Sequence, residues 1–298
     1  MNWFYLSCIN VILYTTYVII VKYISQHVDN LTILTYMSLF SILYIGIYQI
    51  LSNNKIKFEK ISIIFGIWTG IIYYLLNTAI SIVSNPGLVL CIFRFQIIIS
   101  SIMSYFIYGS HLSTYMMIMM CIILVGLFLI TAPIGQDKTI TQHSYKWVIL
   151  SLIAAIMGSI GIIILKYINI NIHNKYNYVQ IIFNIMVGIC IFSAMNEYIT
   201  TKSLYIKYKS YNSSNSSNII YFILLLILGV VFPLYSYLLI KAVNLSPSPS
   251  MPVAIISSNI IPVSIISIFL FKNSELTYTK WGGIGIVLAG VFGLSSIK

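Results

Sequence analysis

Long apolar stretches alternate with short polar breaks along the whole chain. A helix needs about 20 apolar residues to cross the ~30 Å hydrocarbon core of a bilayer. By that measure the pattern predicts ten membrane-spanning helices, separated by proline or by clusters of polar residues. The predicted spans are residues 3–24, 31–51, 61–83, 86–108, 113–132, 147–168, 178–197, 219–241, 251–271 and 281–296. The predicted fold class is therefore an all-α polytopic membrane protein with ten transmembrane helices.

Two segments of the chain carry the same residues at matching positions. Trp3 and the triplet Lys22-Tyr23-Ile24 recur 144 residues later as Trp147 and Lys166-Tyr167-Ile168. A second set of matching residues, at an offset of 164 residues, relates the end of the first half to the end of the chain. Internal duplication inside a membrane protein is typical of secondary transporters.

The repeats and the span count together predict the domain organisation. Residues 1–132 would form a first five-helix repeat and residues 147–298 a second, joined by a polar linker at 133–146. Because five is an odd number, the second repeat would enter the membrane from the opposite side. The sequence thus predicts two inverted five-helix repeats.

The amino-acid composition indicates what surrounds the protein and which partners it has. Hydrophobic residues make up 59% of the chain and charged residues only 7%, whereas a soluble domain carries roughly 25% charged residues. The main partner is therefore the lipid bilayer. The net charge of +11 comes from lysines at span ends and in loops, without a continuous basic surface, so no nucleic acid partner is expected. The four cysteines lie in apolar runs and are interpreted as packing residues, not as metal ligands.

Two further patterns concern packing and anchoring. Gly285, Ala289 and Gly293 form a stripe of small residues in the last span, which predicts interior helix packing, with a homodimer contact as the alternative. Lys22 and Lys166 lie at span ends, as Lys241 also does, and are expected to extend toward the membrane interface.

Arg94 is the only arginine, and it lies inside the fourth predicted span. It follows Pro86 by eight residues, which places it about 12 Å into the membrane at ~1.5 Å per residue. A charge at that depth costs at least ~2.5–3.5 kcal/mol, so the side chain should face a watery cavity. An unneutralised guanidinium there suits a carboxylate or phosphate of a small-molecule substrate. The alternative is an arginine satisfied by backbone carbonyls, asparagine side chains and water.

Other polar residues inside the spans are weaker candidates for substrate contact. Ser258 is the repeat partner of Arg94 at the 164-residue offset, and Asn259 is next to it. Amides within spans need partners, and hydrogen bonding between helices is the alternative role for them. The complete candidate set is Arg94, Gln96, Asn77, Ser258, Asn259, Asn184, Tyr74 and Tyr237.

The acidic residues bear on energy coupling. Asp29, Glu59, Asp137, Glu197 and Glu275 all fall in loops or at predicted span ends. Proton-driven carriers usually pass the proton through buried titratable groups. The sequence therefore favours exchange or facilitated diffusion, and it predicts neither a cofactor nor a metal.

Short motifs in both halves carry a family resemblance. The segment 249–294 contains Pro262, then Glu275-Leu276-Thr277, Gly282 and Leu288-Ala289-Gly290-Val291. A looser version in the first half has Ser84-Asn85-Pro86-Gly87, then His111-Leu112-Ser113 and Gly126. The chain resembles the drug/metabolite transporter superfamily, EamA-like branch, over nearly its whole length.

That resemblance implies a carrier of a small polar solute, with spans 1–4 and 6–9 around a central cavity, spans 5 and 10 outside them, and cytosolic termini. Two positions depart from the family pattern: His111 stands where a glutamate is usual, and Ile98 where a proline is common. Gln96 replaces the lysine typical of nucleotide-sugar carriers, a related group.

The motifs that the sequence lacks exclude some classes of function. The chain lacks the H-E-x-x-H, G-x-S-x-G, P-loop and C-x-x-C patterns, so an enzyme is not expected. The prediction is a secondary transporter of a small polar organic solute, with an anion favoured, that works by alternating access. The alternatives are an organellar nucleotide-sugar or peptide carrier and a non-transporting membrane interaction protein.

Overall fold

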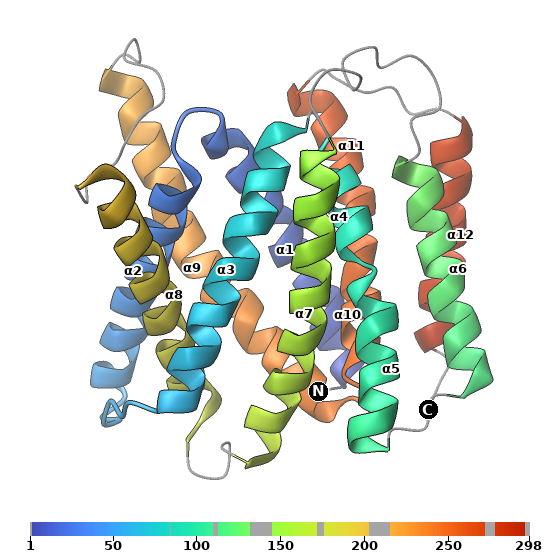
Figure 1. The fold of residues 1–298 in the computed structure, drawn as a ribbon, viewed down its shortest axis with the longest axis horizontal. Helices are drawn as coiled ribbons and strands as arrows, with labels where there is room; N and C mark the ends of the chain where they lie inside the picture. The colour runs from blue at the N-terminus through green and yellow to red at the C-terminus, as the bar shows by residue number, and fades with distance from the viewer. Residues whose placement is uncertain are drawn as a thin grey trace.

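The structure is a computed structural model that describes residues 2–83, 85–109, 113–131, 145–171, 176–202, 215–271 and 278–295. Every element in these ranges is a helix. Figure 1 shows the helices side by side. The predicted linker at 133–146 falls mostly on residues 132–144, which lie outside the described ranges, as do Asp137, Glu275 and His111.

The helices follow the predicted spans closely. The first half contains α1 (Trp3–Ser25), α2 (Asn30–Leu51), α3 (Lys60–Ile82), α4 (Pro86–Phe93), α5 (Gln96–Tyr108) and α6 (Thr114–Thr131). The second half contains α7 (Lys146–Asn171), α8 (Tyr178–Thr201), α9 (Asn215–Leu245), α10 (Ser250–Ile256), the 3₁₀ turn η1 (Ser257–Asn259), α11 (Ile260–Phe271) and α12 (Tyr278–Ser295).

Within the described ranges, eight helices are long and apolar enough to cross a membrane, with α4–α5 and α10–α11 each counted as one. The apolar parts of α6 and α12 are shorter. This confirms an all-helical, multi-pass integral membrane protein. The largest change in length is in α9, which begins at Asn215, before the predicted start at 219.

The packing separates one helix pair from the rest. Helices α6 and α12 contact each other extensively, and Figure 1 shows them together at one edge of the molecule. The other helices pack as α1 against α9, α3 against α7 and α8, and α2 against α8 and α9. The buried apolar side chains of these helices form one continuous core.

Helices α3 and α8 touch through glycine. A methyl group added at Gly66 would collide with the backbone carbonyl of Ile185, and one added at Gly188 would collide with that of Ile63. The two backbones can lie this close only because neither position carries a side chain.

Two repeat-related lysines fold inward. Lys22 is 4% exposed and donates to the carbonyls of Ile80 and Val83 at the end of α3. Lys166 donates to the carbonyl of Val243 near the end of α9, at 3.2 Å. The expectation of extension to the interface was therefore wrong for the buried Lys22, whereas Lys166 is half-buried. The last carbonyls of a helix lack intrahelical donors, and each ammonium group supplies one.

The stripe of small residues in α12 faces mainly outward. Nothing lies within 4 Å of an added methyl group at Gly285, and Ala289 is exposed. Within the stripe, Gly293 packs against α6, where it approaches Met119. The predicted interior packing therefore applies to one end of the stripe.

Gly188→Ala should destabilise the protein, because the added methyl group has no space against the α3 backbone. Overpacking of this kind costs about 1–3 kcal/mol, so the melting temperature in detergent should fall by several degrees. Gly282→Ala is the matched control, since Gly282 has nothing within 4 Å of an added methyl group. Equal melting temperatures for the two variants would contradict the close α3–α8 contact.

Candidate functional site

Two interrupted spans meet near the middle of the protein. The helix break between α4 and α5 falls at Arg94 and Phe95, and the break between α10 and α11 is the 3₁₀ turn Ser257–Asn259. These breaks lie at corresponding positions of the two sequence repeats, 164 residues apart. Discontinuous helices are a common way for transporters to build a binding site at mid-membrane.

The second break has a clear cause. Pro262 has no N–H group, so it cannot donate to the carbonyl of Ser258, its helical partner four residues earlier. The first break has no such proline, because Ile98 occupies the corresponding position. There the backbone tightens instead, and Ile97 N–H donates to the Arg94 carbonyl, three residues back, at 2.9 Å.

Arg94 links the two breaks. Its side chain is 1% exposed, and Nη2 donates to Oδ1 of Asn259 at 2.8 Å. The guanidinium carbon lies 5.2 Å from the ring centre of Tyr14 and 5.6 Å from that of Phe93, within the range of cation–π attraction. A deep cation is thus held by one amide and two aromatic rings.

The site retains unused hydrogen-bonding capacity. Among the described residues, Nε of Arg94 and Nδ2 of Asn259 have no hydrogen-bond partner, although both atoms are buried. Of the described acids, Asp29 and Glu59 lie at the starts of α2 and α3, and Glu197 is bonded by the Thr32 hydroxyl at 2.7 Å. None of these three carboxylates forms an ion pair with Arg94. A buried donor without an acceptor is costly, so an acceptor brought by a ligand would be stabilising here.

A cavity of about 90 Å³ lies beside Arg94. Space of this size holds several water molecules, since one needs roughly 10–15 Å³ on the same measure. Most of its wall is apolar. The residues that line it are Phe65, Thr69, Ile72, Tyr73, Phe93, Arg94, Gln96, Gly158, Gly161, Ile162, Leu165, Ile185, Tyr235, Ser236, Leu239, Ile240, Val253 and Ile256.

Stacked aromatic rings support the cavity wall. Tyr14 stacks on Tyr235 with ring centres 4.9 Å apart, and Tyr73 meets Phe232 edge-on at 4.8 Å. Tyr17 lies against Tyr14 and donates its hydroxyl to Oδ1 of Asn77 at 3.0 Å. Through Tyr14 the cluster also contacts the guanidinium, so α1, α3 and α9 are joined to the two broken spans.

The structure brings some predicted site residues together. Arg94 and Gln96 line the cavity, and Asn259 bonds Arg94. Asn77 is fully buried behind the wall, where it accepts from Tyr17.

The other four predicted residues lie elsewhere. Ser258 bonds its own helix at the Ile255 carbonyl, and Asn184 bonds the Lys57 carbonyl near the start of α8. Tyr74 approaches Phe192 on α8, and Tyr237 packs with Tyr178 and Lys241.

From the tyrosines of the third and eighth predicted spans, the candidate set kept Tyr74 and Tyr237 and left out Tyr73 and Tyr235, and it missed Tyr14 altogether. A signal for Tyr73 was available in α3, because Phe65, Thr69 and Tyr73 recur every four residues and so share one helix face. Its neighbour Tyr74 points to another face for the same reason.

Residues 1–132 match the model of the EamA-like transporter family. This confirms the resemblance inferred from the motifs over the first part of the chain. No curated protein matches the chain. A solved structure titled only as the crystal structure of a protein aligns with a TM-score of 0.69 and 10% sequence identity. The alignment covers 99% of this chain and 96% of the other, so the two share a fold.

Asn259→Leu should lower stability, because it removes the hydrogen bond of a buried cation. Hydrogen bonds to charged groups contribute about 1.5–3 kcal/mol, so a clear drop in melting temperature is expected. Ser258→Ala is the matched control next to it, since that hydroxyl bonds only its own helix and its loss should be nearly neutral. If Asn259→Leu melts like the control, the Arg94–Asn259 bond does not stabilise the fold.

Proposed function

We propose that the protein is a secondary transporter of a small organic anion that works by alternating access. The observation that carries this proposal is Arg94, a buried cation at the meeting point of two broken spans, with one amide acceptor and no described counter-ion. A carboxylate or phosphate on the substrate would supply the missing charge and accept from Nε.

The helix contacts support an arrangement of two inverted five-helix repeats. If the first five spans are exchanged with the last five, the α1–α9 contact becomes the α7–α3 contact, and both are present. The α2–α8 and α6–α12 contacts map onto themselves, as expected for helices that meet at a two-fold axis. Lys22 and Lys166 each bond carbonyls near the end of the third span of their own half. The family match also covers the proposed first repeat, residues 1–132.

The size of the cavity supports a closed state. Ligand pockets usually measure about 300–1,000 Å³, whereas this cavity has about 90 Å³ and its arginine is 1% exposed. A solute larger than a few water molecules would need a wider cavity, which movement of the two halves apart on one side would supply. Rocking of one repeat against the other around a central site is the movement expected of this architecture.

Transport is proposed to proceed by exchange or facilitated diffusion. The termini are proposed to lie in the cytosol, as the family resemblance implies. Glu197 lies within α8 and is 2% exposed, deeper than its predicted position at a span end, because the helix continues to Thr201. It does not line the cavity around Arg94.

Arg94→Leu should abolish uptake of the anion that the wild type carries. The protein would be reconstituted into liposomes and tested with labelled monocarboxylates, dicarboxylates, phosphate esters and zwitterions. Arg94→Lys should retain part of the activity, because it keeps the charge and loses the planar fork. Lys241→Gln is the matched control for loss of one positive charge, since Lys241 lies outside the cavity near Tyr237.

The high burial of Arg94 also favours a static structural role, and the same experiment separates the two. Uptake by a folded Arg94→Leu protein at the wild-type rate would contradict the proposed substrate contact.

Asn259→Asp should block anion uptake while keeping the fold. The new carboxylate would lie at hydrogen-bond distance from the guanidinium and neutralise it. The variant should therefore melt at or above the wild-type temperature and carry the anion at least tenfold more slowly. Retained uptake with an intact fold would show that the charge of Arg94 does not select the substrate.

A further inference from the structure

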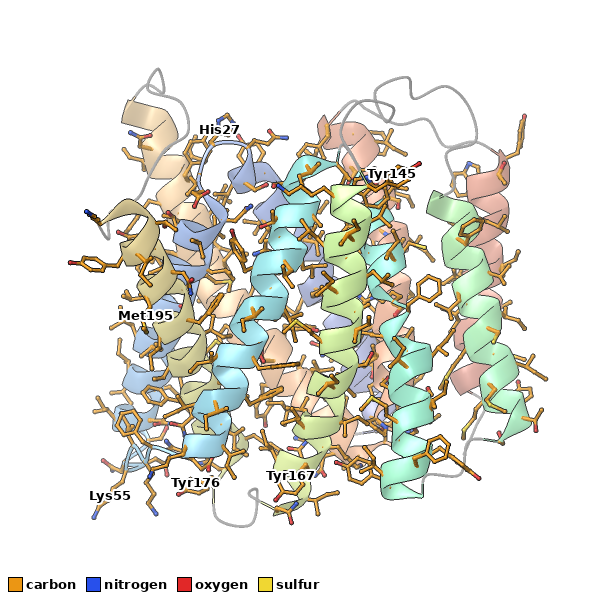
Figure 2. All side chains as sticks on the ribbon, viewed as in Figure 1. His27, Lys55, Tyr145, Tyr167, Tyr176 and Met195 are labelled. Carbon is orange, nitrogen blue, oxygen red and sulfur yellow. The ribbon has the colours of Figure 1, made fainter. Side chains whose placement is uncertain are left out.

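A polar basin of about 300 Å³ lies where α2 ends and α8 begins, away from the central cavity. Figure 2 shows Lys55 and Tyr176 at this end of the molecule, the end where α3 also starts. Its lining is polar, in contrast to the central cavity. The residues are Asn53, Asn54, Lys55, Lys57, Tyr176, Asn177 and Gln180.

The backbone of the basin is held in place. The side-chain amides of Gln180 and Asn184, both buried, donate to the Lys57 carbonyl. Asn53 adopts a left-handed conformation with φ 54°, and Asn54 N–H donates to the Gln49 carbonyl at 2.9 Å, which closes the end of α2. The lysines therefore project from a turn that is tied to α8, not from a free loop.

The electrostatics of the basin favour an anion. Lys55 and Lys57 are exposed at its rim, and the positive end of the α8 dipole lies beside them, where Asn177 caps Gln180 N–H. Glu59 is the described acid nearest in sequence, and its carboxylate accepts from Ile61 and Ser62 at the start of α3. No described acid lines the basin.

An apolar groove of about 310 Å³ runs between α2, α8 and α9. It shares two helices with the basin. On α2, Tyr48 precedes Asn53 by five residues, so the groove lies about 8 Å farther into the membrane at ~1.5 Å per residue. On α8, Val179 belongs to the groove and its neighbour Gln180 to the basin. Tyr44 and Tyr48 are exposed on the groove, which therefore opens toward lipid.

We propose that an anionic phospholipid binds at this position, with its phosphate-bearing headgroup in the basin and one acyl chain in the groove. A membrane-surface anion site and an apolar channel leading from it into the hydrocarbon match the two chemical parts of such a lipid. A soluble phosphate compound would use the basin alone. The groove wall includes Pro233 of α9, and the same helix lines the central cavity through Tyr235 and Ser236. The lipid would thus touch a helix that also faces the cavity, but its binding requires no transport activity.

Native mass spectrometry of the purified protein in neutral detergent tests this site. Titration with dioleoylphosphatidylserine should give one tightly bound lipid, at least tenfold tighter than dioleoylphosphatidylcholine. A lysine beside an anionic surface contributes about fivefold in affinity, so Lys55→Gln with Lys57→Gln should weaken binding roughly 25-fold. Val179→Trp should fill the groove and weaken binding at least tenfold. If that variant does not fold, Tyr48→Ala, at an exposed position, should weaken it several-fold.

The matched control removes two lysines at the opposite membrane face, Lys146→Gln with Lys202→Gln, and should leave lipid binding unchanged. An equal loss in this control would show general attraction of anionic lipid to a basic protein and overturn the proposal. Glycerophosphoserine, which has the headgroup without the chains, should displace the lipid at least a hundredfold less effectively. If it competes as well as the intact lipid, the basin is a site for soluble anions and the groove takes no part.

Discussion

The hydrogen bond between Arg94 and Asn259 joins two helix breaks deep in the protein, and much of the central architecture depends on it. A guanidinium is too costly in hydrocarbon to lie against lipid, so the face of the α4–α5 span that carries Arg94 must be covered by other helices. Its one amide partner comes from the second broken span, which fixes these two spans side by side. Tyr14 covers the cation from α1, which brings a third span into the same centre.

The surroundings of that cation combine strong charge with a mainly apolar wall. The hydroxyls of Thr69 and Ser236 bond carbonyls of their own helices, and Arg94 is the charged residue among those that line the cavity. A solute held here would meet one fixed charge and several aromatic or aliphatic faces. Such a site would select solutes first by an acidic group, because that group would pair with the desolvated charge and orient the solute. It would then select by the shape of the rest of the solute, because an apolar wall binds best what fits it in size.

The helices could be predicted from the sequence because hydrocarbon imposes a simple rule of length and polarity. Arg94, Gln96 and Asn259 could be found for a related reason, since polar groups within spans are rare and need partners. The tyrosines were harder to assign. With 24 of them in the chain, composition does not distinguish Tyr73 from Tyr74, and only the rotation of α3 about its axis decides which ring faces the cavity.

The course of lysine side chains near span ends could not be predicted for a different reason. A long side chain at such a position can reach water or turn back to the protein. Lys22 turns back because the last carbonyls of α3 lie within reach, and that proximity depends on tertiary packing. The inward course of Lys166 has the same origin. Pairwise distances of this kind do not follow from the spacing of residues along the chain.

The two helix breaks differ in the hydrogen bonds that their sequences allow. In the second half Pro262 has no N–H group, so the helical hydrogen bond to the Ser258 carbonyl can never form there. In the first half Ile98 retains its N–H group, so the Arg94 carbonyl, which accepts from Ile97, could accept from Ile98 as it would in a regular α-helix. The missing hydrogen bond is therefore fixed by the sequence of the second half, whereas the first half keeps the N–H group that a continuous helix would use.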